Sequence, residues 1–172
     1  MFEFAMITGL NITGDEATGD GTQRRNMLHD AYFEGQGTVL LTQPFDAIRR
    51  CDQMLDRLKL GLVYILESMV RCHHKKTTTD LFHLEIVDDI DRFNDYPWGW
   101  RCFEDTVYVF IRSHSKLKGA IRKYDTYGLP LTVQIWAYET VHLMGARFAR
   151  RGETRCPRMH HWRASRSEGC ST

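Results

Sequence analysis

The sequence lacks several features by which protein classes are recognised. Its five cysteines are an odd number without a Cys-x-x-Cys pair, which argues against a disulfide framework and favours a reducing, intracellular compartment. Its longest apolar stretch, 60–70, is interrupted by Glu67 and falls far short of a bilayer span. No basic-then-apolar leader opens the chain. We therefore expect a protein that is neither secreted nor embedded in a membrane.

An excess of charge of either sign is also missing. The chain has 23 Lys and Arg residues against 22 Asp and Glu, so no global field recruits nucleic acid or an anionic membrane. The C-terminal end is the exception, because arginines there outnumber Glu153 and Glu168. These arginines are Arg147, Arg150, Arg151, Arg155, Arg158, Arg163 and Arg166.

What remains is the composition of a folded domain. The chain has 172 residues, of which 42% are hydrophobic and 26% charged, as is usual for one globular domain. Apolar residues recur at helical spacing along most of it. We expect a mainly α fold, a single helical domain of about five to six helices. Segment 39–41 is either part of one short strand pair or an extended connection.

Turn and cap residues divide the helical pattern. Pro44 suits the first position of a long helix, which we expect to break near 51–54 with Asp52 capping its second half. A residue of 79–80 should cap a third helix that carries apolar side chains as far as Phe93.

Helical spacing over 100–111 favours a further helix, although 107–111 alone would fit a strand. A last helix is expected over 131–148. We place a helical domain at 1–150 and a basic, disordered tail at 151–172. The expected structural core includes Leu62, Leu66, Trp98, Phe103 and Trp136.

Four sequence blocks carry a family resemblance. They are Phe4–Asn11 (FAMITGLN), Leu62–Ser68 (LVYILES), Val87–Glu104 (with VDD, YPWG and FE) and Gly128–Glu139 (with GLPL and QIWAYE). Together they resemble a plant-specific domain of unknown function found in transposon-derived proteins. That domain often precedes a cysteine-peptidase domain similar to SUMO-specific proteases, and it is distantly similar to the plant mobile domain.

The resemblance implies a mobile-element origin and a nuclear setting, and it supplies no catalytic residue. Family domains usually continue upstream of the first block, so N-terminal truncation of the chain stays open. Segment 163–172 matches nothing in the family, and a decaying fragment without function is kept as an alternative.

A SUMO-protease-like active site needs a His base, an orienting acid, an oxyanion-hole side chain and a Cys at the head of a helix. His161 and Trp162 resemble the His-Trp pair of those enzymes, but only Cys170 lies downstream. We therefore expect no enzyme activity, and a truncated remnant of such a peptidase is the alternative.

Two sets of polar residues have the types that bind metals. Zinc could bind the set Cys156, His160, His161 and Cys170, or the Cys-His-His run at 72–74. In the first set, however, a flexible arginine-rich segment lies between the ligands. We expect no cofactor and solvated side chains there, with a structural zinc left open. The carboxylates Glu85, Asp88, Asp89 and Asp91 could hold Mg²⁺, but an acidic solvent face is the preferred interpretation.

Aromatic and basic residues suggest two kinds of interface. The aromatics Tyr96, Trp98, Trp100, Phe103 and Trp136 could line a peptide groove, but a helical core is the preferred interpretation. A solvated tail is preferred over weak, non-specific nucleic-acid binding, because stacking aromatics are limited to Trp162. The candidate contacts are Arg147, Arg150, Arg151, Arg155, Arg158 and Arg163.

The leading hypothesis is a non-catalytic helical interaction or accessory module of a plant transposable-element-derived protein. Its expected partner is an unidentified protein, with neither a membrane nor a small molecule involved.

Overall fold

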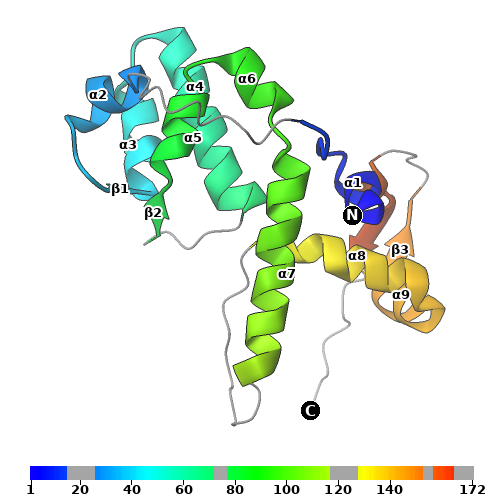
Figure 1. The fold of residues 1–172 in the computed structure, drawn as a ribbon. Coiled ribbons are helices and arrows are strands. Elements are labelled where there is room, and N and C mark those ends of the chain that lie inside the picture. The colour runs from blue at the N-terminus through cyan, green and yellow to red at the C-terminus, as the bar shows by residue number, and fades with distance from the viewer. Residues whose placement is uncertain (15–25, 72–76, 117–127, 153–156, 165–172) are drawn as a thin grey trace, which may run out of the picture.

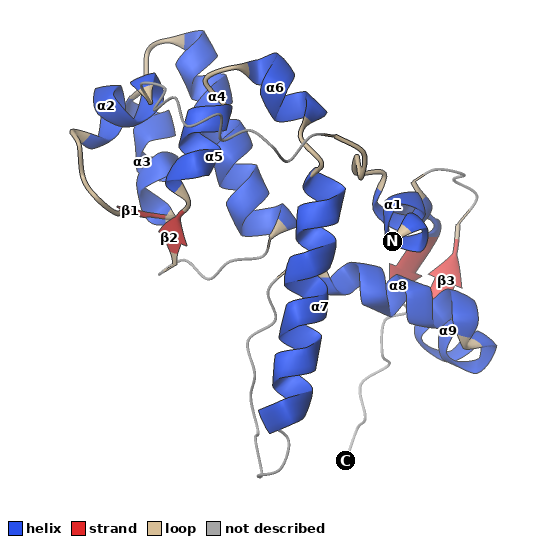
Figure 2. Cartoon of the chain, in the orientation of Figure 1, coloured by secondary structure: helices blue, strands red, loops and turns tan. Residues whose placement is uncertain are grey.

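The computed structural model describes residues 1–14, 26–71, 77–116, 128–152 and 157–164. Within these residues the fold is mainly α, as expected, with two short antiparallel strand pairs (Figure 2). The helices are α1 (Phe2–Thr8), α2 (Met27–Phe33), α3 (Thr42–Arg50), α4 (Met54–Ile65), α5 (Leu81–Ile86), α6 (Ile90–Asp95), α7 (Trp98–Lys116), α8 (Pro130–Thr140) and α9 (His142–Phe148). A π-helical turn η1 (Leu66–Val70), a 3-10 turn η2 (Arg158–His161) and strands β1 (Val39–Leu40), β2 (Thr78–Thr79), β3 (Ala149–Arg151) and β4 (Trp162–Ala164) complete the elements.

The elements form two lobes on either side of α7 (Figure 1). The central lobe consists of α2 to α6 with η1, β1 and β2. The terminal lobe consists of α1, α8, α9, η2, β3 and β4, and it brings the first helix of the chain against elements near its end. A backbone hydrogen bond joins the start of α7 to the segment that follows α1, since Gly99 N donates to Asn11 O at 2.7 Å.

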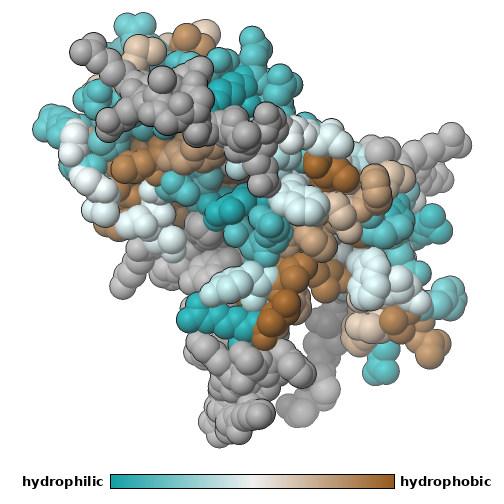
Figure 3. Space-filling view, viewed as in Figure 1, coloured by the Kyte–Doolittle hydropathy of each residue, from teal (hydrophilic) through white to brown (hydrophobic). Residues whose placement is uncertain are grey.

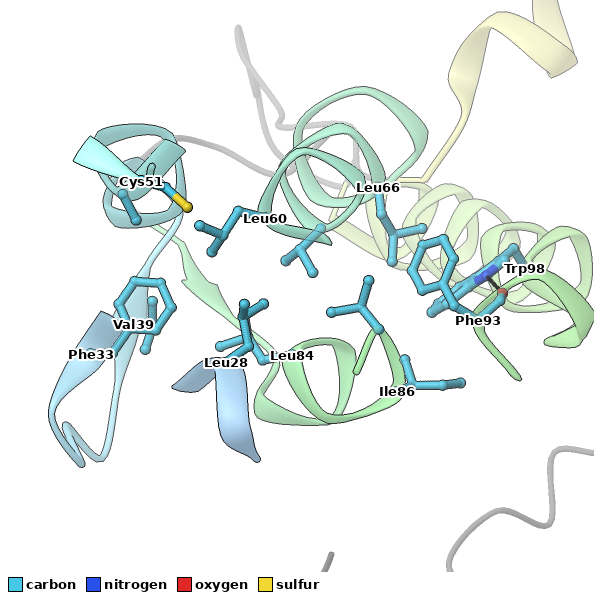
Figure 4. Close-up of a cluster of buried hydrophobic side chains, with 13 residues drawn as sticks. Leu28, Phe33, Val39, Cys51, Leu60, Leu66, Leu84, Ile86, Phe93 and Trp98 are labelled. Atoms are coloured by element: carbon cyan, nitrogen blue, oxygen red, sulfur yellow. Dashed lines mark hydrogen bonds between the residues drawn. The ribbon is translucent and has the colours of Figure 1, made fainter. Parts of the chain in front are cut away.

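The central lobe has a closed hydrophobic core (Figure 4). Leu60 on α4 and Leu84 on α5 are wholly buried in it, and Leu66 on η1 is 4% exposed. Trp98 closes the cluster from α7, with its indole Nε1 donating to Phe93 O at 2.7 Å. The expected core positions Leu66 and Trp98 are therefore confirmed, and Leu62 is a half-buried residue packed against the cluster.

The break in the long helix lies where the sequence predicts it, but its cap differs. Helix α3 ends at Arg50 and α4 begins at Met54, with Gln53 at the N-cap position. The prediction that Asp52 caps α4 is wrong. Instead, Arg57 Nε donates to Cys51 O at 3.2 Å, which satisfies a backbone carbonyl in the break.

Two predicted helices each divide into two, which accounts for part of the excess of helices in the described residues over the five to six expected; α1 and α2 were not predicted as helices. Asp80 caps α5 by accepting from Phe82 N at 3.0 Å, as predicted. The predicted helix does not continue unbroken to Phe93, because Asp89 caps a separate helix, α6, by accepting from Arg92 N at 3.1 Å. The last predicted helix divides at Val141 into α8 and α9. Helix α7 is continuous, which confirms the helical interpretation there.

The first strand pair joins segments far apart in the chain, whereas the second joins neighbouring segments near its end. Val39 pairs with Thr79 and Leu40 with Thr78, so the strand interpretation of this segment is confirmed. In the second pair, Ala149 lies opposite Ala164 and Arg150 opposite Arg163.

Part of the segment predicted as a disordered tail instead forms secondary structure, since 158–164 contains η2 and β4. The indole of Trp162 packs on Tyr138, with ring centroids 5.6 Å apart, and its Nε1 donates to Glu139 Oε1 at 3.3 Å. One large aromatic side chain and strand pairing thus order a segment whose arginine-rich composition indicates disorder. The remaining tail residues, 153–156 and 165–172, lie outside the described part of the chain.

Candidate functional site

A buried polar network joins η1, α5 and α7. Glu67 and His83 are 1% and 2% exposed, and His83 Nδ1 lies 2.6 Å from Glu67 Oε1. Arg71 Nε donates to Asp105 Oδ2 at 2.8 Å, and Arg71 NH1 lies 3.4 Å from His83 Nε2. Burial opposes the charge of Arg71, but the hydrogen bond and charge of Asp105, with the charge of Glu67, outweigh it and raise the pKa of Arg71.

Both ring nitrogens of His83 face side chains of this network. A carboxylate on Nδ1 is the orientation that a general base needs, but Arg71 faces the other ring nitrogen of His83, where a reacting group would have to lie. The backbone of Arg71 also links the end of η1 to the segment before α8, since its carbonyl oxygen accepts from Gly128 N at 2.7 Å. The π-helical turn η1 contains Glu67, and Arg71 follows directly after it, so this turn positions both side chains in the network.

An apolar groove of about 410 Å³ lies between α1, α7 and α8. Hydrophobic side chains gather on the face of α7 beside α8 (Figure 3). The exposed fractions of Phe110, Ile111 and Trp136 are 42%, 66% and 48%. The groove is lined by Met1, Glu3, Phe4 and Ile7 of the N-terminal segment, Phe103, Thr106, Val107, Phe110 and Ile111 of α7, and Thr132, Val133 and Trp136 of α8.

The lining residues of α7 form one helical stripe, at positions i, i+3, i+4, i+7 and i+8 from Phe103. Helix α1 covers the first part, where Phe4 packs edge-on against Phe103 with ring centroids 5.7 Å apart. Helix α8 starts beside Thr106, whose Oγ1 accepts from Leu129 N at 2.9 Å. Beyond that point α8 diverges from α7 (Figure 1), and the stripe continues uncovered to Ile111.

Gly128 makes the close approach at Thr106. Its φ of 76° lies in the left-handed region, and a Cβ there would clash with Thr106 Oγ1. A larger residue would therefore push α8 away from α7.

The prediction that Trp136 lies in the core is wrong. Helix α8 buries Thr132, Ile135 and Tyr138, which places Trp136 on the groove side with about half its surface exposed. Phe103, another expected core residue, is half-buried at the inner end of the same groove. The peptide-groove alternative thus fits Trp136 better than the preferred core interpretation does.

The candidate arginines do not form one surface. Arg158 NH1 pairs with Glu139 Oε2 at 3.0 Å, and its NH2 pairs with Glu3, so Arg158 is a link between η2, α8 and α1. Arg147 on α9 lies over the Phe148 ring, 5.6 Å from its centroid. Arg150, Arg151 and Arg163 are exposed on the strand pair. Arg155 lies outside the described residues.

The metal candidates are largely untested by the structure. Cys156, Cys170 and the cluster 72–74 lie outside the described residues, while His160 and His161 belong to η2. Within the described ranges, no three His, Cys, Asp or Glu side chains are placed to share a metal ion.

The acidic residues of the central lobe have structural roles. Asp88 accepts from the buried Lys59 Nζ at 3.3 Å, Glu85 pairs with Arg92 at 3.7 Å, and Asp89 is the cap of α6. Of the predicted acidic solvent face, Asp89 is exposed, whereas Glu85 and Asp88 are half-buried and paired with basic side chains. Across the described segments, no helix is long and apolar enough to cross a membrane.

The comparison with known proteins identifies a family whose description assigns no function. No curated protein and no solved structure matches the chain. A family model described as a domain of unknown function, DUF1985, matches residues 1–108. The matched region contains α1, the central lobe and the first half of α7, and it stops before α8. Because this match covers more than half of the 172 residues, the chain belongs to the DUF1985 family.

Proposed function

We propose that the chain is a non-catalytic protein-interaction module, and that its partner inserts an amphipathic helix into the groove between α1, α7 and α8. The observation that carries this proposal is the apolar stripe of α7, which continues past its cover and leaves Phe110 and Ile111 exposed beside Trp136. A contiguous apolar surface of this kind marks interaction sites on soluble proteins.

The shape of the groove favours a helix as the occupant. Helices α1 and α8 cover only part of the α7 stripe, so a further helix alongside would complete a small bundle. Apolar side chains at i, i+3 or i+4, and i+7 of the partner would meet Val107, Ile111 and Trp136.

The charge of the groove supports an apolar contact face on the partner. Glu3 has the charged side chain among the residues that line it, and its carboxylate is already paired with Arg158. A partner charge buried here would lack a counter-charge, which is costly. Burial of the exposed ring and aliphatic surfaces would contribute roughly 25 cal/mol for each Å² of apolar area removed from water.

The biological setting of the module, a plant nucleus, is part of the same proposal. The four sequence blocks suggest a plant protein derived from a transposable element, acting in the nucleus and associated with a SUMO-protease-like domain. In that setting the module would contact a protein partner and would need neither a membrane nor a small molecule.

A selection with displayed peptides tests the proposal. A phage library of helical peptides with randomised surface positions would be selected on the full chain, and enriched peptides would be measured by fluorescence anisotropy. We expect enrichment of apolar residues at helical spacing. Ile111→Glu should weaken the selected peptides by about tenfold or more, because it places a carboxylate in the contact.

Leu143→Glu is the matched control, since Leu143 is 80% exposed on α9 and does not line the groove. It should change affinity by less than about twofold. Peptides without helical spacing, or peptides that bind the Ile111→Glu chain as tightly as the unmodified chain, would contradict the proposal.

A further inference from the structure

The antiparallel pair β3–β4 places two arginines directly opposite each other. Arg150 lies across from Arg163, and the next pair along the ribbon is Arg151 with Trp162. Side chains that face one another across strands have Cβ atoms about 4.5–5.5 Å apart, and like charges in such a pair destabilise it. The register therefore concentrates positive charge at a cost in stability.

The packing of Trp162 shows which face of the ribbon carries this pair. Trp162 contacts Tyr138 of α8, so its face points toward the helices. Ala149, two residues before Arg151 and on the same face, is 7% exposed. Arg150 and Arg163 alternate with these residues and hence point away from the helices, and both are exposed.

Neither arginine is neutralised by a carboxylate in the described part of the terminal lobe. Glu3 and Glu139 are the acidic residues of α1 and α8, and both are paired with Arg158. Glu139 also accepts from Trp162. Among the described residues, Arg150 and Arg163 form no ion pair, so the outer face of the ribbon presents two unopposed guanidinium groups.

The ribbon is also held in place. Trp162 fixes β4 on α8, and Gly145 of α9 is so close to it that a Cβ there would lie 3.2 Å from the Trp162 ring. The α9 helix runs directly into β3 at Ala149. Two guanidiniums on a fixed support lose less side-chain freedom when they bind a shared anion than two on a flexible tail.

We infer that the outer face of the β3–β4 ribbon, with Arg150 and Arg163 side by side, binds the phosphate groups of a nucleic-acid backbone. Guanidinium forks match phosphate oxygens in a bidentate geometry. An exposed pair can hold one phosphate or two successive ones. The aromatic of the ribbon, Trp162, is turned inward and is not free to stack on bases, so binding would be independent of sequence.

This surface is separate from the apolar groove, and its test is independent of the proposed function. Fluorescence anisotropy with a labelled 20-base-pair duplex would compare the full chain with Arg150→Ala/Arg163→Ala over a range of salt concentrations. We expect the double variant to bind roughly tenfold more weakly at low salt, with the slope of log K against log salt reduced by about 2.

The matched control is Arg49→Ala/Arg50→Ala, which removes the same charge from exposed positions on α3 in the central lobe. It should leave affinity within about twofold and the slope unchanged. Circular dichroism would show that both variants are folded. Arg150→Lys/Arg163→Lys should retain part of the affinity, because it keeps charge and loses the fork.

Equal weakening by the two alanine pairs would overturn the inference, because binding would then follow net charge alone. Absence of duplex binding by the unmodified chain at low salt would also overturn it. A third arm uses vesicles of phosphatidylserine and phosphatidylcholine. Loss of vesicle binding in the ribbon variant without a matching loss of duplex binding would assign the surface to lipid phosphates and overturn the nucleic-acid inference.

Discussion

The core of the central lobe and the groove of the terminal lobe place hydrophobic side chains in different settings. In the central lobe, α2 to α6 enclose Leu60, Leu84 and their neighbours completely. In the terminal lobe, α1 and α8 cover only part of the α7 stripe and leave Phe110 and Ile111 in contact with solvent. The difference separates residues that hold the fold together from residues that are available to a partner, although both sets share the same helical spacing.

The largest effect should come from the network that joins the lobes to α7. Arg71→Met would remove the positive charge between Asp105 and Glu67 and leave their carboxylates in a largely buried position. We expect the free energy of unfolding to fall by about 3–5 kcal/mol, as when one partner of a buried pair is removed. Urea unfolding followed by circular dichroism measures it. A loss below about 1 kcal/mol would mean that the network is not buried in solution.

The contrast between the lobes is tested by paired truncations. Leu84→Ala leaves a cavity in the closed core and should cost about 2–5 kcal/mol of unfolding free energy. Ile111→Ala, at a side chain that is 66% exposed, should change it by less than about 0.5 kcal/mol. Similar losses from the two substitutions, measured by urea unfolding, would show that the groove is closed in solution and is part of the core.

A smaller, local effect should follow from Trp162→Ala. This change removes the indole that fixes β4 on Tyr138 and Glu139, so the ribbon should open without unfolding the central lobe. Hydrogen exchange of the amides of 149–151 should accelerate, while those of α4 around Leu60 should stay protected. Acceleration at both places would indicate that the two lobes unfold as one unit.

The sequence predicts those features that depend on neighbouring residues. The cap at Asp80 follows from its side chain, and the spacing from Trp100 predicts α7. Pro44 indicates the start of a helix, but it is the third residue of α3, which begins at Thr42, and not the first as predicted. The break at Asp89 was missed because its carboxylate was assigned to an acidic solvent face. An Asp placed between two apolar helical segments is also a cap signal, and that signal would have found it.

Features that depend on distant residues were not predictable in the same way. Glu67 lies in an apolar run and His83 is 16 residues away, so their contact is visible only in three dimensions. An acidic residue inside an apolar run does signal a buried charge that needs a partner. Trp136 could not be assigned because α8 is apolar around most of its circumference, and the bond from Leu129 to Thr106 decides which face turns inward.

The Arg158 link between α1 and α8 bears on where this folding unit ends. Ile7, on the first helix, is 1% exposed because α8 and η2 pack over α1, and both lie beyond residue 108. A fragment cut at the end of the family match would keep the central core and strip the cover from the opening helix. The stretch of sequence that the family model matches is thus shorter than the stretch of chain that is needed to bury α1.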